Sequence, residues 1–283
     1  MSISNQSFKE YSFAHHGEVY KILDTVFRSN GISYYLIGAN ARDVALYKVG
    51  EKPKRATADI DFAVMVPNHE QFDAVKEELK KHGFEKSFGN MPYSLFHSES
   101  KTTIDLLPFG GIEEERIVRF AEGNLELSAV GMMQVSKEVE SFDHPYGIAL
   151  PVSPAHGLVI LKLIAWSEKP EDREKDLGDT ANILRIAWAL YEPEMFREDA
   201  EHSDLFEMEN FDTRFVGARI MGRKMKRILV LDAELEVKIN DLLNQEIQDS
   251  SSPLAIALVK ALGCKMNYAK EIIKSLKLGV TEK

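Results

Sequence analysis

The sequence predicts a mixed α/β domain over residues 1–152, followed by an all-helical domain over residues 153–283. As far as residue 152, segments with helical spacing alternate with short runs of β-branched and aromatic residues, which is typical of a mixed sheet with flanking helices. After Pro151, apolar residues recur almost only at helical spacing. Ser153-Pro154 also has the form of a helix start, with serine as the N-cap and proline at the first helical position.

The first domain begins with a helix expected over residues 8–29, where apolar residues recur at helical spacing and Asn30-Gly31 is a typical C-terminal stop. Residues 34–66 are expected to form a strand, a helix and a second strand, with Gly38 at the first turn. The remaining elements predicted in this domain are a helix over 69–82, two strands over 84–97 and 102–109, and short edge strands at 126–130 and 147–152.

The second domain contains apolar stripes that predict long helices. A linker over residues 248–253 precedes a final helical pair. The residues of the two clearest stripes are Leu177, Ala181, Leu184, Trp188 and Tyr191, and then Val237, Ile239, Leu242, Leu243 and Ile247.

Carboxylates interrupt two of the predicted strands. Asp59 and Asp61 lie two residues apart and therefore point to one face of their strand, and Asp105 lies similarly between apolar residues of the other. Clustered carboxylates repel one another unless a cation lies among them, and hard oxygen ligands suit Mg²⁺. A solvated strand end or a helix N-cap also explains a single Asp-x-Asp, but the second interrupted strand favours a magnesium site for phosphoryl chemistry.

A glycine turn precedes these acids. Gly38 separates the apolar run Tyr34–Ile37 from a helix that starts near Ala41. Glycine allows the backbone to approach a ligand closely, and the N–H groups at a helix N-terminus bind anions. The turn is therefore a candidate phosphate site, although an ordinary strand-to-helix turn has the same sequence.

The order of these motifs resembles the DNA polymerase β-type nucleotidyltransferase superfamily, with a glycine turn, an acidic-x-acidic strand and a third acidic strand. Within it, Leu36–Ala39 and Arg55–Asp61 are similar to the AbiEii/AbiGii toxin family of type IV toxin–antitoxin systems. Lys162 and the run Arg173–Asp179 partly match that family's later motifs. The turn departs from the signature at Ala39, where the superfamily has glycine or serine.

The resemblance implies a nucleotidyltransferase-like fold and the transfer of a nucleoside monophosphate from a nucleoside triphosphate to a hydroxyl acceptor, with release of pyrophosphate. Asp59, Asp61 and Asp105 would be the catalytic residues and would bind two Mg²⁺ ions, which Mn²⁺ could replace. Implied partners are the triphosphate, an acceptor such as tRNA or another RNA, and an antitoxin protein. The residues expected to bind the nucleotide are Gly38, Ala39, Asn40, Lys162, Lys175 and Asp179.

Simpler explanations exist for the later lysines. Lys162 lies among apolar residues and could extend from an apolar helix face to solvent. Lys175 and Asp179 are one helical turn apart and could form an ordinary ion pair.

Residues 214–227 carry six cations and no acid. On a helix, Arg219, Arg223 and Arg227 form one basic stripe, because they are spaced four residues apart. The stripe is either a surface for the acceptor or a polyphosphate, or a solvated helix face paired with neighbouring acids.

Composition excludes several other classes of protein. A net charge of −10, from 35 basic and 45 acidic residues, argues against a broad nucleic-acid-binding surface. Cys264 is the single cysteine, which excludes an intrachain disulfide and a cysteine zinc site. The polar N-terminus and the lack of a long apolar run predict a cytoplasmic protein without a membrane segment.

Three other functions stay open from sequence. The acceptor could be an antibiotic or another small hydroxylated molecule. Gly38–Asp43 also resembles the glycine turn of tRNA CCA-adding enzymes, without that group's second glycine. The chain could also be a non-catalytic nucleotide-binding regulatory module.

Overall fold

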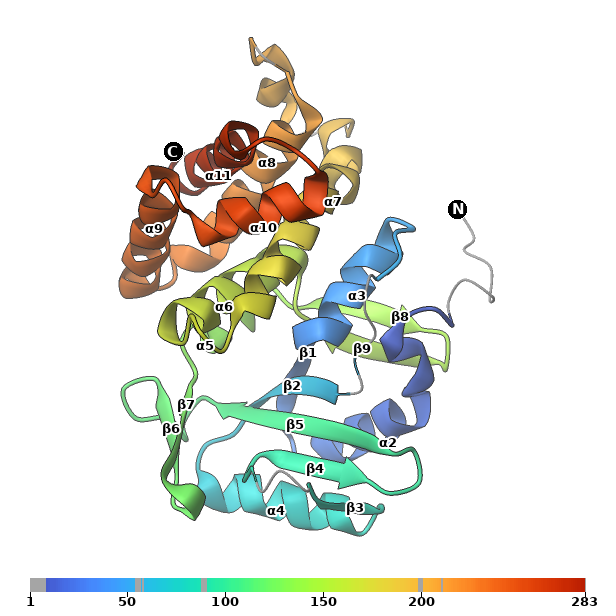
Figure 1. Ribbon diagram of the computed structural model, residues 1–283. Helices are drawn as coiled ribbons and strands as arrows, with labels where there is room; N and C mark the ends of the chain where they lie inside the picture. Colours follow the sequence, from blue (N-terminus) through green and yellow to red (C-terminus); the bar gives the residue numbers. More distant parts are fainter. Residues whose placement is uncertain are drawn as a thin grey trace. The chain divides into compact units, whose positions relative to one another are not determined.

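The computed structural model describes residues 9–53, 57, 59–87, 91–197, 201–209 and 211–282, which divide into two compact units with a boundary after Pro154. Arg55, Ala56 and Ala58, which contribute to the family likeness, lie outside the described residues, and so does the start of the helix expected over 8–29. The predicted architecture, a mixed α/β part and a helical part, is confirmed (Figure 1).

Within the described residues of the first unit, seven strands form one mixed sheet in the order β3-β4-β5-β2-β1-β9-β8. Strand β2 lies antiparallel to β1 and parallel to β5, and β1 lies parallel to β9. The strands of this sheet are β1 (Ser33–Ile37), β2 (Asp59–Met65), β3 (Phe84–Lys86), β4 (Ser94–His97), β5 (Thr102–Phe109), β8 (Glu140–His144) and β9 (Ile148–Val152). A separate hairpin consists of β6 (Ile117–Phe120) and β7 (Leu125–Ser128).

The helical elements of this unit are η1 (Ser12–His15), α2 (Gly17–Ser29), α3 (Gly38–Lys48), α4 (His69–Lys80), η2 (Glu122–Asn124) and α5 (Met132–Val135). Figure 1 shows α2 and α4 on the same side of the sheet. The ring of Phe62 on β2 is fully buried and contacts Tyr20 and Phe27 of α2. The apolar face of β2 therefore faces α2, and its acidic face points the other way.

Three predictions for this unit were wrong. The segment 84–97 was expected to be one strand, but it contains the two antiparallel strands β3 and β4. The helix expected over residues 8–29 is divided at His16, and Gly17 packs so closely against Tyr146 that a Cβ on Gly17 would lie 2.3 Å from the ring. The segment 147–152 was expected at a sheet edge, but β9 lies between β1 and β8. The edge strand β8 was missed because it is short and has only two buried residues.

His16 makes the stability of the first unit depend on pH. The residue is 9% exposed, and its Nδ1 lies 3.3 Å from Thr102 Oγ1. Burial, together with His15 and His144, lowers the pKa of His16 to about 4. The unfolded chain takes up this proton near pH 6.5, whereas the folded chain does so only near pH 4. This contribution to stability is therefore complete above pH 6.5 and is lost as the pH falls toward 4, by up to about 3 kcal/mol.

The comparison that tests this is thermal unfolding of the wild-type chain and of His16→Gln between pH 7.5 and 4.5. The wild type should lose melting temperature more steeply than the variant, because glutamine takes up no proton. Identical pH profiles would show that His16 does not contribute.

The second unit contains α6 (Ala155–Glu168), α7 (Glu174–Met195), η3 (Ser203–Glu207), α8 (Thr213–Leu229), α9 (Ala233–Gln248), α10 (Pro253–Leu262) and α11 (Met266–Thr281). Helices α8 and α11 pack closely at Gly222, where a Cβ would lie 2.1 Å from the carbonyl oxygen of Leu276. The predicted linker ends where expected, since Ser252 caps α10 and Pro253 opens it. Among the described residues, no helix has both the length and the apolar character needed to cross a membrane.

Candidate active site

The predicted aspartates lie on the face of the sheet that points away from α2, in the first unit. Strands β2 and β5 pair in parallel, with Asp61 directly beside Asp105 and Asp59 beside Thr103. Neighbouring strands are about 4.8 Å apart, so the backbones of Asp61 and Asp105 are separated by roughly that distance. Asp59 is exposed, and Asp61 and Asp105 are half-buried. Their immediate neighbours on the two strands, Ile60, Ile104 and Leu106, are buried. The strand alternation therefore directs all three side chains to the same face.

Gly38 lies directly against the carboxylate of Asp61. It is the first residue of α3, directly after β1, and has φ +64°. A Cβ at this position would lie 1.9 Å from Oδ2 of Asp61 and 2.7 Å from its Cγ. The carboxylate thus occupies the space that any larger residue would need. The sequence indicated Gly38 as a phosphate site but did not reveal this contact.

The side chain of Asn40, which was predicted to bind the triphosphate, lies inside the first unit. Its side chain is 0% exposed, and its Nδ2 donates to the backbone oxygen of Asp59 at 2.7 Å. The hydroxyl of Tyr20 donates to Asn40 Oδ1 at 3.4 Å. The side-chain amide is therefore engaged inside the unit, while Gly38 and Ala39 are only half-buried.

A buried ion pair follows Asn40 on α3. Arg42 Nη2 lies 2.6 Å from Asp43 Oδ1, and both side chains are almost fully buried. Burial raises the pKa of Asp43, and Arg42 opposes that rise. The sequence patterns predicted no functional role for this ion pair or for Tyr20.

The carboxylates fit a metal of the magnesium class in kind and in placement. They are hard oxygen donors on adjacent strands of one sheet face, and Asp59 is exposed to solvent. Among the described residues, no three acidic, histidine or cysteine side chains are already gathered closely enough to enclose a metal ion. Asp59 is exposed, so its side chain has room to change rotamer.

Lys162 lies in a buried charge cluster of the second unit. Its Nζ is 2.9 Å from Asp176 Oδ1 and 2.8 Å from Asp179 Oδ2, and all three residues are less than 8% exposed. Helices α6 and α7 are joined by these bonds. Two of the nucleotide-binding residues predicted in this unit, Lys162 and Asp179, therefore bind each other. The third, Lys175, is exposed at the surface.

The basic stripe on α8 is paired with acids. Arg223 makes two bonds to Asp204, of 2.7 and 2.5 Å, and a third to Glu282 at 2.6 Å. Arg219 also pairs with Glu282, and Arg227 pairs with Glu201. The stripe therefore forms as predicted, and its arginines are neutralised by acids that lie far away in the sequence.

Comparison with known families decides the assignment. The family model for the nucleotidyl transferase AbiEii toxin, of type IV toxin–antitoxin systems, matches residues 44–253. This chain belongs to the AbiEii toxin family. The match confirms the resemblance predicted from the motifs. It includes the three aspartates, Lys162 and Asp179, and it begins after the Gly38 turn.

Other comparisons add little to the AbiEii assignment. No curated protein matches the chain. The solution structure of the antibiotic-resistance factor ANT(2'')-Ia aligns with a TM-score of 0.38 and 9% sequence identity, covering 83% of this chain and 98% of that chain. A likeness this distant carries no conclusion about substrate.

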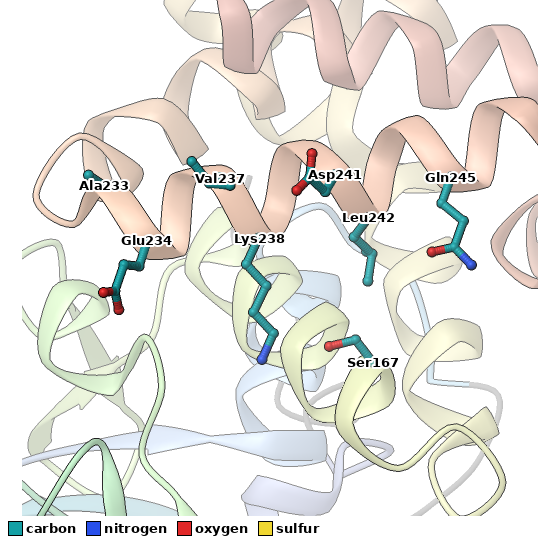
Figure 2. Close-up of a pocket in the computed structure, with 8 residues that line it drawn as sticks. All are labelled: Ser167, Ala233, Glu234, Val237, Lys238, Asp241, Leu242 and Gln245. Atoms are coloured by element: carbon teal, nitrogen blue, oxygen red, sulfur yellow. The ribbon is translucent and has the colours of Figure 1, made fainter.

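An open groove of about 670 Å³ lies in the second unit of this AbiEii protein (Figure 2). One face of α9 lines it, together with Ser167 near the end of α6. Lys238 at the groove forms an ion pair with Glu168 at 2.8 Å. None of the residues predicted for catalysis or nucleotide binding lines this groove.

The buried Lys162 cluster predicts a large effect on stability. Replacing Lys162 with methionine should destabilise the chain by about 3–5 kcal/mol, because it removes the cation that Asp176 binds at 2.9 Å and Asp179 binds at 2.8 Å. Lys175→Met is the matched control on the exposed side of α7 and should change stability by no more than about 0.5 kcal/mol. Urea unfolding measures both. Similar stabilities of the two variants would contradict a structural role for Lys162.

Proposed function

We propose that this chain is a metal-dependent nucleotidyltransferase that transfers a nucleoside monophosphate from a nucleoside triphosphate to a hydroxyl group of an RNA, with release of pyrophosphate. The observation that carries the proposal is the register that sets Asp61 directly beside Asp105, against the Gly38 turn, in a member of the AbiEii family.

The three aspartates have separate roles in this proposal. Asp59 and Asp61 hold Mg²⁺, as two ions that Mn²⁺ can replace. When bound, the metal neutralises phosphate charge and makes the α-phosphate easier to attack. Asp105, beside Asp61 on the next strand, completes the ligand set and accepts the proton of the acceptor hydroxyl. Attack on the α-phosphate then releases pyrophosphate.

The start of α3 is proposed to bind the triphosphate. Backbone N–H groups in the first turn of a helix have no partner within the helix and attract anions. Gly38 and Ala39 are accessible enough to contribute them, whereas the Asn40 side chain is engaged elsewhere. In the helical unit, exposed Lys175 is the candidate cation for the phosphates. Lys162 can contribute only if Asp176 and Asp179 release it.

RNA is proposed as the acceptor, and the α8 stripe as its contact. With a net charge of −10, the chain needs a local basic surface to bind RNA. Arg219, Arg223 and Arg227 form such a surface if RNA phosphates replace their carboxylate partners. An antitoxin protein is the further partner that we propose from the type IV toxin–antitoxin family.

The acceptor class is tested by incubating the protein with each α-labelled triphosphate and Mg²⁺, together with total RNA or a panel of hydroxylated antibiotics. The proposal predicts labelled RNA, and weaker labelling after charge reversal of the α8 stripe. Label on a small molecule alone would replace the RNA proposal, and binding of triphosphate without any transfer would indicate a regulatory module.

A further inference from the structure

Asn40 carries a polar amide and is buried beside the candidate active site. It is the third residue of α3, and its side chain is 0% exposed. Its bond to the Asp59 carbonyl joins the first turn of α3 to the first residue of β2, across 19 positions of sequence. An amide is rarely buried in this way unless its hydrogen bonds are needed, because burying it without partners costs free energy.

The orientation of the Asn40 amide is fixed by its two partners. The carbonyl oxygen of Asp59 can only accept, so the nitrogen of the amide must face it. The oxygen end accepts from Tyr20, whose ring is fully buried and packs edge-on against Phe62. Burial, with Asp43 and Asp61 nearby, holds the pKa of Tyr20 well above its usual value, so its hydroxyl keeps its proton at neutral pH.

The side-chain amide of Asn40 lies where the backbone pairing between β1 and β2 ends. Ile37 is the last residue of β1 and pairs with Asp61, and α3 begins at the next residue. In the register of these described strands, the ladder from β1 therefore stops short of Asp59. The side chain of Asn40 supplies to the Asp59 carbonyl the hydrogen bond that a longer β1 would have supplied.

We propose that Asn40 is a positioning residue, which fixes the backbone of Asp59 so that its carboxylate joins Asp61 and Asp105. The inference rests on the proposed metal site and adds a residue to its support. Asp61 has strand partners on both sides, in Ile37 and Asp105, and therefore does not depend on Asn40. Loss of the amide should act on Asp59 in particular.

The experiment compares Asn40→Ala with the wild type by hydrogen exchange and by Mg²⁺ dependence. Exchange should accelerate in peptides that contain Asp59 and Ile60, and not in those around Ile104. The Mg²⁺ concentration for half-maximal transfer should rise by about 10- to 100-fold, which is the usual effect of removing support from a metal ligand. High Mg²⁺ should restore much of the rate, which a general loss of folding would not allow.

Tyr20→Phe keeps the test usable if Asn40→Ala does not fold. It removes only the hydroxyl that orients the amide and should shift the Mg²⁺ requirement in the same direction by a smaller factor. An unchanged exchange rate at Asp59, or a lower rate with an unchanged Mg²⁺ requirement, would overturn the positioning role. A wild-type protein that transfers no nucleotide would instead overturn the proposed function, and the exchange data would still decide whether Asn40 holds Asp59.

Discussion

Replacing Asp61 with asparagine is expected to lower the rate of nucleotide transfer by at least about a thousandfold, which corresponds to about 4 kcal/mol in the activation free energy. The amide has the same size as the carboxylate but lacks the negative charge that the proposed metal needs. Asp61 lies beside Asp105, so removal of one charge also relieves repulsion in the metal-free protein. The melting temperature should therefore hold or rise. Initial rates and thermal unfolding measure the two effects.

Asp143→Asn is the matched control for Asp61→Asn, since Asp143 is an exposed aspartate on β8 of the same sheet. It should leave the transfer rate unchanged. If Asp61→Asn kept more than about a tenth of the wild-type rate, Asp61 could not be a metal ligand in the reaction.

Replacing Gly38 with alanine should lower transfer by at least about a hundredfold, or roughly 3 kcal/mol. The added Cβ would lie 1.9 Å from Asp61 Oδ2, so the carboxylate has to leave its position. The backbone at Gly38 has φ +64°, which also costs alanine about 1–2 kcal/mol of stability. Transfer rates should be measured together with the free energy of unfolding.

Gly31→Ala is the control that separates backbone strain from displacement of the Asp61 carboxylate. Gly31 has nearly the same φ, +66°, but no heavy atom within 4 Å of an added Cβ. The two variants should lose similar backbone stability, and only Gly38→Ala should lose activity. Equal activity losses would mean that backbone strain, and not displacement of Asp61, is responsible.

The strands of the candidate site were predictable because their pattern is local. At the start of β2, buried apolar residues alternate with acids, and this spacing alone indicates that Asp59 and Asp61 share a face. In β5, Asp105 lies between buried Ile104 and Leu106. The pairing of Asp61 with Asp105 was not predictable in register, because it depends on two strands about forty residues apart. The fit of Gly38 to Asp61 and the support of Asp59 by Asn40 depend on the same tertiary arrangement.

In the helical unit, periodicity predicted the helices but not the partners of their charges. Lys175 and Asp179 have the spacing of a helical ion pair, yet Asp179 binds Lys162 from the neighbouring helix. The arginines of α8 form a stripe as predicted, but one of their partners is Glu282, near the end of the chain. Contacts between helices decide both outcomes, and the sequence spacing within one helix cannot reveal them.

The most direct measurement follows the fate of two phosphate labels. The protein is incubated with RNA and with a triphosphate labelled at either the α- or the γ-phosphate, with Mg²⁺ or with excess chelator. A metal-dependent nucleotidyltransferase should attach only the α-label to RNA and release pyrophosphate, and chelation should abolish both. Transfer of the γ-label, or transfer of the α-label that persists in chelator, would contradict this function.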